Sequence, residues 1–211
     1  MTSANHPEPN RKTGRRINVE LYSAITAIVL SALSIVVAYR SELTQREMLA
    51  ASVWPHLQFG HGNVGDDGVP RIAFQITNVG TGPARVVDFQ MFDEQRPVTT
   101  VSELLKCCTQ SEQVDLRGLS VVSTPVEQPV LPANEGLSFF QLQQHNADPE
   151  LWEALNKRRF RMWVRVCYCS VLNDCWELDS RQALHRPVQA CSVAERSGFN
   201  ARSKPPQSLT R

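Results

Sequence analysis

Apolar residues are distributed unevenly along this chain, with one long uncharged run near the start and short alternating runs after it. Residues 21–39 (LYSAITAIVLSALSIVVAY) carry no charged side chain. A helix of that length spans roughly 28 Å at ~1.5 Å per residue, close to the ~30 Å apolar core of a bilayer. The run therefore predicts a transmembrane helix over residues 17–39.

The residues on either side of this run predict its orientation. Lysine and arginine near the ends of a membrane helix set its topology, and the richer side stays in the cytoplasm. Four such residues come just before the run and two just after it: Arg11, Lys12, Arg15, Arg16, Arg40 and Arg46. We expect a single-pass topology with the N-terminus in the cytoplasm and the C-terminal domain outside.

Two other structures would give a similar run. A cleaved signal peptide has an apolar region of about 7–15 residues followed by a small-residue cleavage site, whereas this run is longer and ends in Val37-Ala38-Tyr39-Arg40. A buried core helix would have a polar face, and the serine and threonine residues of this run are scattered. An uncleaved signal anchor fits the sequence best.

The segments around the run define the domain organisation. Residues 40–52 are good helix formers and predict a helical stalk, which ends at Trp54 because proline disfavours helix in the residue before it. Residues 1–16 are polar and basic and predict a disordered cytoplasmic tail, and residues 192–211 predict a second disordered tail. Residues 53–191 remain as one folded ectodomain.

Small residues recur every four positions in the predicted membrane helix, at Ser23, Ala27 and Ser31. They share one helix face, and small residues at this spacing let two membrane helices approach closely. The face is therefore a candidate contact for a homodimer. The alternative interpretation is that serine and alanine are common in such helices.

Beyond Pro55 the apolar period changes to two. Ile72, Phe74 and Ile76 alternate with polar or small residues, as in a half-buried strand. Further strands are expected at residues 84–92, 119–122, 126–131, 137–142, 160–169 and 175–178, and short helices at 103–108, capped by Ser102, and from Asp148 to about Lys157. About seven or eight short strands indicate a mainly β fold, one antiparallel immunoglobulin-like β-sandwich with two short helices.

One turn carries a recognisable motif. In Asn78-Val79-Gly80-Thr81-Gly82-Pro83-Ala84, the glycines can take positive φ and the proline fixes its own. With Trp54-Pro55-His56-Leu57, this turn resembles uncharacterised bacterial single-pass membrane proteins that share a W-P-x-L start and an N-x-G-x-G-P-A turn in a β-rich ectodomain. It is also loosely similar to bacterial adhesion-type immunoglobulin-like modules. The resemblance covers residues 20–92 and implies a location in the bacterial cytoplasmic (inner) membrane, with no activity to transfer.

The folded region contains all six cysteines: Cys107, Cys108, Cys167, Cys169, Cys175 and Cys191. An even number in an extracytoplasmic domain predicts disulfides, although sequence alone does not fix their pairing. A hairpin between Cys169 and Cys175 would place these two directly across from each other. Cys107 and Cys108 would bond each other only with strain, so we expect them to reach two different partners, such as Cys167 and Cys191.

Other candidate chemistry is weak. The spacings C-C, C-x-C and C-x5-C match a zinc site poorly, and a redox C-x-x-C is absent. His56 and His61 would point to opposite faces of one strand, so a shared metal would need a bulge at Gly60. No known catalytic or phosphate-binding motif occurs. We expect no catalytic residue, no cofactor and no metal.

One basic cluster lies at residues 157–161 (KRRFR), followed by Arg165. It would suit an anionic surface or acidic partner, but a solvated helix end that complements the helix dipole is the preferred interpretation. Along the strand expected there, Phe160 and Met162 share one face. Trp163 shares the other with Arg161 and Arg165, which allows cation–π packing. The net charge of +1 argues against nucleic acid as a partner.

These observations lead to two main functional hypotheses. The preferred one is a non-catalytic, membrane-anchored extracytoplasmic module for protein interaction or envelope assembly, with the lipid bilayer and an unknown envelope protein as partners. The alternative is a membrane-tethered thiol-redox protein or enzyme that uses Cys107 with Cys108, or Cys167 with Cys169. A weaker third hypothesis is a sensor that couples the ectodomain to partners through the basic N-terminal tail.

Overall fold

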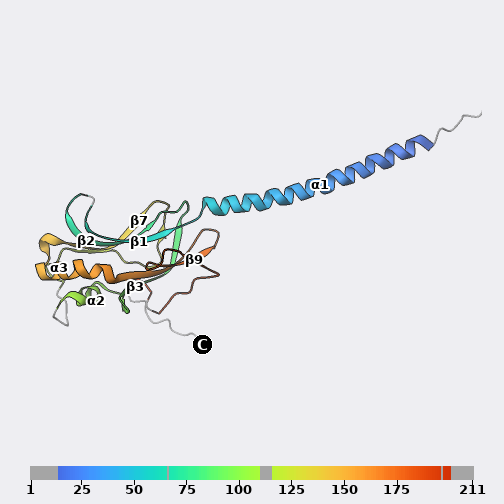
Figure 1. Cartoon of the computed structure of the whole chain (residues 1–211). Helices are drawn as coiled ribbons and strands as arrows, with labels where there is room; N and C mark the ends of the chain where they lie inside the picture. The colour runs from blue at the N-terminus through green and yellow to red at the C-terminus, as the bar shows by residue number, and fades with distance from the viewer. Residues whose placement is uncertain (1–13, 66, 110–115, 196, 201–211) are drawn as a thin grey trace, which may run out of the picture. The chain divides into compact units, whose positions relative to one another are not determined.

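The computed structural model describes residues 14–65, 67–109, 116–195 and 197–200, with side chains from residue 19 onward. The chain divides into two units, with the boundary between Leu49 and Ala50. The first unit is helical, and the second contains all the strands of the described residues (Figure 1).

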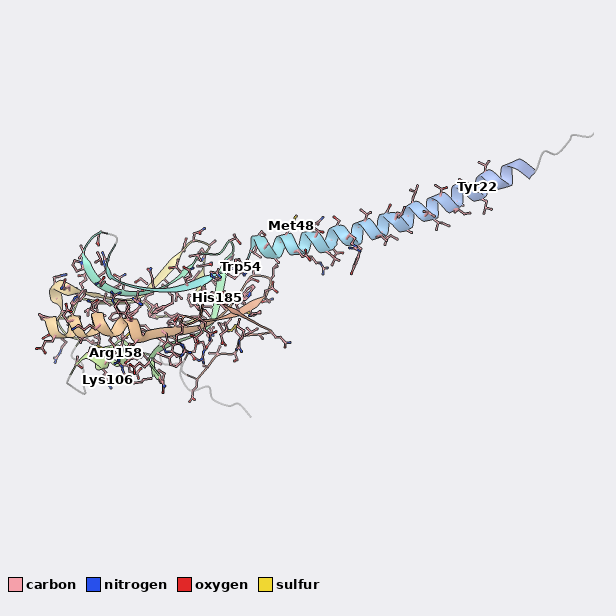
Figure 2. All side chains as sticks on the ribbon, in the orientation of Figure 1. Tyr22, Met48, Trp54, Lys106, Arg158 and His185 are labelled. Carbon is pink, nitrogen blue, oxygen red and sulfur yellow. A yellow bond between two sulfur atoms is a disulfide. The ribbon has the colours of Figure 1, made fainter. Side chains whose placement is uncertain are left out.

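A single long helix, α1 (Gly14–Ser52), includes both the predicted membrane segment 17–39 and the predicted stalk 40–52. Its part from Val19 to Ser52 is long and apolar enough to span a membrane, and none of its most apolar stretch is buried within the protein. Side chains such as Tyr22 and Met48 project freely from it (Figure 2). The helix ends just before Trp54, as the proline rule predicts.

The predicted N-terminal tail needs one adjustment. Residues 14–16 already belong to α1, because nothing in Gly14-Arg15-Arg16 stops a helix that the apolar run propagates. Residues 1–13 lie outside the described part of the chain.

The second unit is built mainly from antiparallel strands, as predicted. One sheet has the order β1 (Leu57–Val64), β2 (Pro70–Asn78), β7 (Gly136–Gln143) and β5 (Val121–Ser123). The other has the order β10 (Arg186–Val188), β9 (Cys175–Asp179), β8 (Met162–Cys169), β3 (Ala84–Asp93) and β4 (Arg96–Val98), with β6 (Val130–Leu131) paired to β3. The short strands β4 and β10 were not expected from the sequence.

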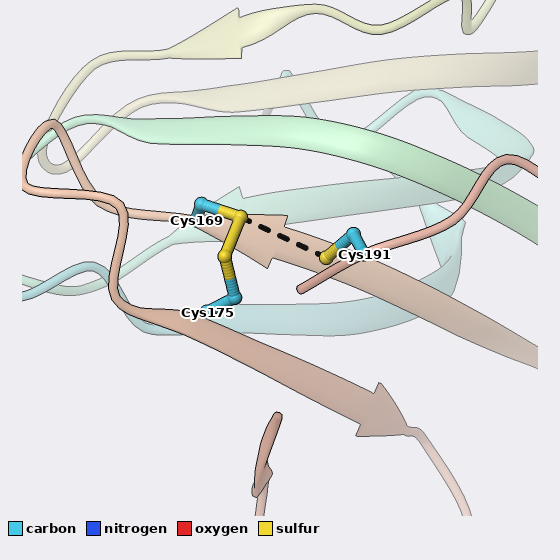
Figure 3. A group of neighbouring side chains, drawn as sticks. All are labelled: Cys169, Cys175 and Cys191. Atoms are coloured by element: carbon cyan, nitrogen blue, oxygen red, sulfur yellow. Dashed lines mark hydrogen bonds between the residues drawn. A yellow bond between two sulfur atoms is a disulfide. The ribbon is translucent and has the colours of Figure 1, made fainter. Parts of the chain in front are cut away.

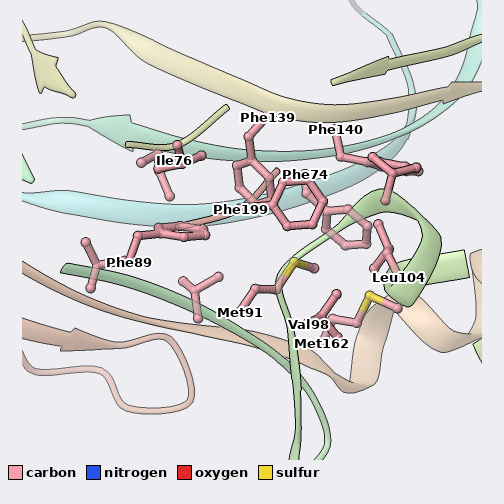
Figure 4. Close-up of a cluster of buried hydrophobic side chains, with 14 of the residues drawn as sticks. Phe74, Ile76, Phe89, Met91, Val98, Leu104, Phe139, Phe140, Met162 and Phe199 are labelled. Carbon is pink, nitrogen blue, oxygen red and sulfur yellow. The ribbon is translucent and has the colours of Figure 1, made fainter. Parts of the chain in front are cut away.

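Both sheets contribute to one hydrophobic core (Figure 4). The ring of Phe139 on β7 lies 5.2 Å from the ring of Phe89 on β3 and 6.3 Å from the ring of Phe74 on β2. A register shift between β2 and β7 allows Phe139 and its neighbour Phe140 to be buried together, although adjacent residues of a regular strand point to opposite faces. The core therefore holds the two sheets together.

Two α-helices lie in the connections. Helix α2 (Val101–Leu105), followed by the 3-10 turn Lys106–Cys108, is capped by Thr100, whose hydroxyl accepts a hydrogen bond from the Glu103 N–H. The cap is therefore not Ser102, because the Glu103 carboxylate reaches back to Thr99 and starts the helix earlier. Helix α3 (Pro149–Arg158) begins at the predicted cap, Asp148.

The C-terminal segment was predicted as a disordered tail over residues 192–211, and this is wrong for the part near Phe199. Phe199 is fully buried, and its ring lies 5.3 Å from that of Phe139. The backbone pairs with Val126 and donates a hydrogen bond from Gly198 to the Phe89 carbonyl. The buried ring of Phe199 and these backbone contacts together hold the segment against the core. Residues 196 and 201–211 lie outside the described residues.

Asn78, at the end of β2, is a fully buried polar centre of this unit. Its Oδ1 accepts hydrogen bonds from the N–H groups of His56 and Gly80, both at 3.1 Å. Its Nδ2 lies 2.8 Å from the Gly82 carbonyl oxygen and 3.0 and 3.1 Å from the Leu131 and Pro132 carbonyl oxygens. One amide thus connects three separate segments of the chain.

The glycines of the motif make this arrangement possible. A Cβ atom at Gly80 would lie 2.4 Å from the Trp54 carbonyl oxygen, and one at Gly82 would lie 2.2 Å from the Val53 carbonyl oxygen. Residues 53–56 therefore lie directly against the turn, and the Trp54 carbonyl accepts hydrogen bonds from the N–H groups of Thr81 and Gly82. The two motifs of the sequence pack on each other and form one structural element.

Replacing Asn78 with alanine is expected to lower the free energy of unfolding by about 3 kcal/mol or more, because each buried polar group left without a partner costs about 1–3 kcal/mol. Urea unfolding of the full chain in detergent measures the loss. The control is Asn63→Ala on β1, where the side chain is only partly buried and the expected change is within about 0.5 kcal/mol. Equal losses in both variants would contradict the role of Asn78.

Candidate functional site

A hollow with a volume of about 830 Å³ lies beside strand β1. We call it the β1 hollow. One wall comes from Phe59, Gly60 and His61 on β1. The rest of its lining is Glu94, Gln95, Phe160, Arg161, Met162, Trp163, Ser180 and Arg181. It therefore lies where the edge of one sheet faces the other sheet.

Aromatic rings and guanidinium groups stack at this site. The rings of Trp163 and Phe92 lie parallel, 4.2 Å apart. The Arg181 guanidinium lies 3.5 Å from the centre of a Trp163 ring, and that of Arg165 lies 5.6 Å away. The expected cation–π packing of Trp163 is confirmed for Arg165. The sequence did not reveal Arg181, which comes from the turn after β9.

Phe160 does not lie on the expected strand, where the alternation placed it on the same face as Met162. It belongs to the 3-10 turn Arg159–Arg161, before β8 begins at Met162. Its side chain is 68% exposed at the hollow. The pattern failed because the helical turn after α3 extends one residue past Phe160, so the strand period starts later.

The basic cluster is neither an open cationic patch nor a simply solvated helix end. The Arg158 Nε donates to the Asp93 carboxylate at 2.7 Å, and Asp93 is buried. This pairing raises the pKa of Arg158. The Arg161 Nη1 lies 2.8 Å from the Glu94 carboxylate. The cluster thus ties the end of α3 to the turn between β3 and β4, while Arg161 remains largely exposed.

The structure does not bring His61 together with His56, the two histidines that a shared metal would need. The Nδ1 of His61 lies 3.0 Å from the Arg159 Nη1. Burial, and secondarily the charge of Arg159, lowers the pKa of His61. The ring of His56 instead stacks on that of His185, with ring centres 4.2 Å apart. The β1 register shift lies after Gly62, not at Gly60.

His185 belongs to a small, partly buried cluster with His56 and Tyr168 that the sequence did not reveal. Its Nδ1 lies 2.5 Å from the hydroxyl oxygen of Tyr168 on β8. Burial, and secondarily the charge of His56, lowers the pKa of His185 to about 4, and burial raises the pKa of Tyr168 to about 12. Through His56 and His185, the cluster joins the start of the β-rich unit to the segment before β10. No local pattern marks a contact between residues so far apart in sequence.

The six cysteines form three disulfides. Cys169 and Cys175 pair across the β8–β9 hairpin, as predicted. The prediction that Cys107 and Cys108 reach Cys167 and Cys191 is wrong, because Cys107 bonds Cys108 and Cys167 bonds Cys191. Cys107 and Cys108 lie on the turn after α2, while the other four lie at β8, β9 and the segment that returns past them.

The Cys169–Cys175 bridge lies close to Cys191, which belongs to another bridge (Figure 3). The sulfur atoms of Cys169 and Cys191 are 3.7 Å apart, although they belong to different disulfides. The sulfurs of Cys169, Cys175 and Cys191 all lie within 4.8 Å of one another. Such a cluster could hold a metal only after reduction, since thiolate sulfur is the ligand form.

The remaining candidate residues occupy the expected elements. Ser23, Ala27 and Ser31 lie on the exposed surface of α1, and the Ser23 hydroxyl donates to the Glu20 carbonyl of its own helix. Asn78, Gly80, Gly82 and Pro83 form the turn between β2 and β3. These turn residues support structure, and none of them lines the β1 hollow.

No protein-family model and no curated protein matches this chain. The class of protein therefore comes from the structure alone. It is a mainly β protein of antiparallel sheets with a few short helices and one N-terminal helix apolar enough to span a membrane.

Removing the Cys167–Cys191 bridge by double alanine substitution is expected to lower the free energy of unfolding by about 3 kcal/mol, because the bridge closes a loop of 24 residues. Removing Cys107–Cys108 in the same way should cost far less, since neighbouring residues enclose no loop. Urea unfolding under non-reducing conditions compares the two variants. A larger loss for the Cys107–Cys108 variant would contradict this explanation.

The His185 cluster predicts a loss of stability in mild acid. Because the pKa of His185 is about 4 in the folded chain and about 6.5 when unfolded, only the unfolded state takes up the proton between these values. Stability is therefore full above about pH 6.5 and falls as the pH drops towards 4. His61, whose pKa is also lowered, contributes in the same direction.

The variant His185→Gln keeps a polar partner for Tyr168 and removes the titrating ring. Thermal unfolding of this variant between pH 7 and pH 4 should show a smaller decrease in Tm than the wild type. His145→Gln is the control, because His145 lies in an exposed turn and should leave the pH profile unchanged. Parallel profiles for wild type and His185→Gln would rule out the cluster as the cause.

Proposed function

We propose that this chain is a single-pass protein of the bacterial cytoplasmic membrane, whose β-rich domain lies outside the cytoplasm and acts as a non-catalytic module for protein interaction or envelope assembly. The observation that carries the interaction role is the β1 hollow. It combines an exposed phenylalanine, a tryptophan and two arginines, Phe160, Trp163, Arg161 and Arg181. Aromatic residues and arginine are the types most enriched where proteins bind one another.

The anchor supports the location in this proposal. Between Leu21 and Tyr39 the side chains of α1 are exposed and mostly apolar, and none is charged. Leaving this surface in water would be unfavourable by about 25 cal/mol for each Å² of apolar area. A bilayer covers it. The basic residues before the helix favour the cytoplasm for the N-terminus.

The three disulfides support the proposed location of the β-rich domain outside the cytoplasm. Disulfides persist in oxidising compartments such as the periplasm and are rare in the cytoplasm. Every described cysteine is bonded to another, which suits a domain on the oxidising side. A homodimer through Ser23, Ala27 and Ser31 remains part of the proposal, since these three small side chains share one face of α1.

Three variants, each with a photo-crosslinking residue at one exposed position, test the interaction role in living cells. The positions are Phe160 at the β1 hollow, Val122 on β5 and Leu184 before β10. We expect a discrete adduct of reproducible mass from one of these positions, in the carbonate-resistant membrane fraction. No adduct from any position, or recovery of the chain in the soluble fraction, would contradict the proposed function.

One observation favours the thiol-redox alternative. The Cys107–Cys108 bridge joins neighbouring residues and closes no loop, so stabilisation of the fold by loop closure does not account for it. Cys107 also lines a second hollow of about 720 Å³ with Arg96 and Arg158. In this alternative, two thiols of another molecule reduce the bridge and become a disulfide themselves. Titration of the native protein after mild dithiol treatment tests it, and a bridge that resists reduction would end this alternative.

A further inference from the structure

Strand β1 is the edge of its sheet, and no described strand lies on its other side. The Val79 N–H donates to the His56 carbonyl, and the antiparallel register continues from Leu57 opposite Asn78. Hydrogen-bonded pairs alternate along such a ladder. The backbone groups of Phe59 and His61 therefore point away from β2, towards the open edge.

Strand β1 contains two glycines. Gly62 comes directly before the register shift of the strand, whereas Gly60 lies in its regular part and is not explained by the fold. A Cβ atom at Gly60 would lie 3.6 Å from Gln75, and one at Gly62 would lie 3.6 Å from the Val64 carbonyl oxygen, both ordinary contacts. Neither glycine has positive φ. Gly80 and Gly82, in contrast, have no room for a side chain. Glycine inside a strand costs stability and often marks a place where another backbone approaches closely.

The β1 hollow lies directly beside this edge. Phe59, Gly60 and His61 form its wall on the β1 side, and the exposed Phe160 stands across from them. The ring of His61 lies 5.2 Å from that of Phe160 in an edge-to-face arrangement. Successive side chains of a strand point to opposite faces. Every second side chain of an extended chain bound along β1 would therefore point into the hollow and contact these rings.

The charges at the hollow indicate which side chains a ligand would carry. The side chains of Arg161 and Arg181 are 63% and 53% exposed, and their carboxylate partners Glu94 and Asp179 leave the guanidinium groups accessible. Only Glu94 among the lining residues is acidic. Counted with Asp179, the two arginines are balanced by two carboxylates, and the surplus positive charge comes from Arg159 at the rim. Its guanidinium lies 4.3 Å from the centre of the Phe160 ring and pairs with no carboxylate among the described residues. The hollow and its rim are thus net positive and complement a carboxylate.

We infer that the edge of β1 and its hollow bind an extended, acidic segment of a partner protein, which adds to the sheet as a further antiparallel or parallel strand. Backbone hydrogen bonds to Phe59 and His61 supply affinity. An apolar side chain beside Phe160 and a carboxylate beside Arg161 and Arg181 supply specificity. This inference rests on the proposed interaction function and names its site and the chemistry of its partner.

A second copy of the chain is the main competing occupant. Pairing β1 with β1 of another copy would bring two net-positive hollows towards each other, and like charges across an interface are unfavourable. An acidic partner segment has no such conflict. Hydrogen exchange of the detergent-solubilised chain distinguishes the two occupants, because self-pairing would protect the Phe59 and His61 amides without any added peptide, whereas a dimer through α1 would leave them unprotected.

A displayed library of random peptides about ten residues long, the upper range of a strand, is the probe. It is selected against the full chain in detergent. We expect enriched peptides with acidic residues and apolar residues at alternate positions. Hydrogen exchange should then show protection of the Phe59 and His61 amides on binding. No enrichment, or protection at β4, β5 or β10 instead, would overturn the inference.

Matched variants separate the backbone contribution from the side-chain contribution. His61→Pro removes an outward N–H that β2 does not use, and His61→Ala keeps it. We expect the proline variant to bind the selected peptide about tenfold more weakly than the alanine variant, the effect of about one lost hydrogen bond. If the proline variant fails to fold, the exchange measurement on the wild type decides. Equal binding by folded variants would overturn the inference.

The arginines have their own control. Arg161→Gln with Arg181→Gln should weaken peptide binding about tenfold at low salt and reduce its salt dependence. Arg186→Gln, which lies on β10 outside the hollow, should change neither. If the peptide experiments fail while adducts form at Val122 or Leu184, the interaction function stands and only this site is wrong.

Discussion

The buried side chain of Asn78 is the interaction on which the rest of the β-rich unit depends. It bonds to the backbone of residue 56, of its own turn and of residues 131 and 132. An amide can do this because it both donates and accepts, whereas a carboxylate or an apolar residue cannot. The position of Asn78 fixes where β1 starts, and therefore where the open edge of the sheet and the β1 hollow lie.

This role changes the meaning of the two motifs that the sequence displays. Gly80 and Gly82 leave room for residues 53–56, so the W-P-x-L and N-x-G-x-G-P-A segments pack against each other. A resemblance based on these segments therefore concerns how the first residues of the β-rich unit pack against the turn between β2 and β3. It contains nothing about a ligand, which is consistent with the absence of motif residues from the hollow. The family resemblance itself remains a prediction.

Much of the fold followed from local patterns, and the site did not. The long uncharged run, the period-two strands, the Asp148 cap and the Cys169–Cys175 hairpin are signals within a few residues, and all appear in the structure. The stacking of His56 on His185, the burial of Phe199 and the Cys167–Cys191 bridge join distant residues that no local period connects. Phe160 was misplaced because a single 3-10 turn delayed the strand. The immunoglobulin-like assignment also stays a prediction.

The position of the β-rich unit outside the cytoplasm is the claim that ties the anchor, the disulfides and the interaction role together. Labelling of intact cells with a membrane-impermeant thiol reagent, with and without prior reduction, tests it most directly. We expect labelling only after reduction, because the cysteines are bridged and, in the proposed topology, lie outside the cytoplasm. Labelling that requires permeabilised cells and no reductant would place the domain in the cytoplasm with free thiols and would contradict the account.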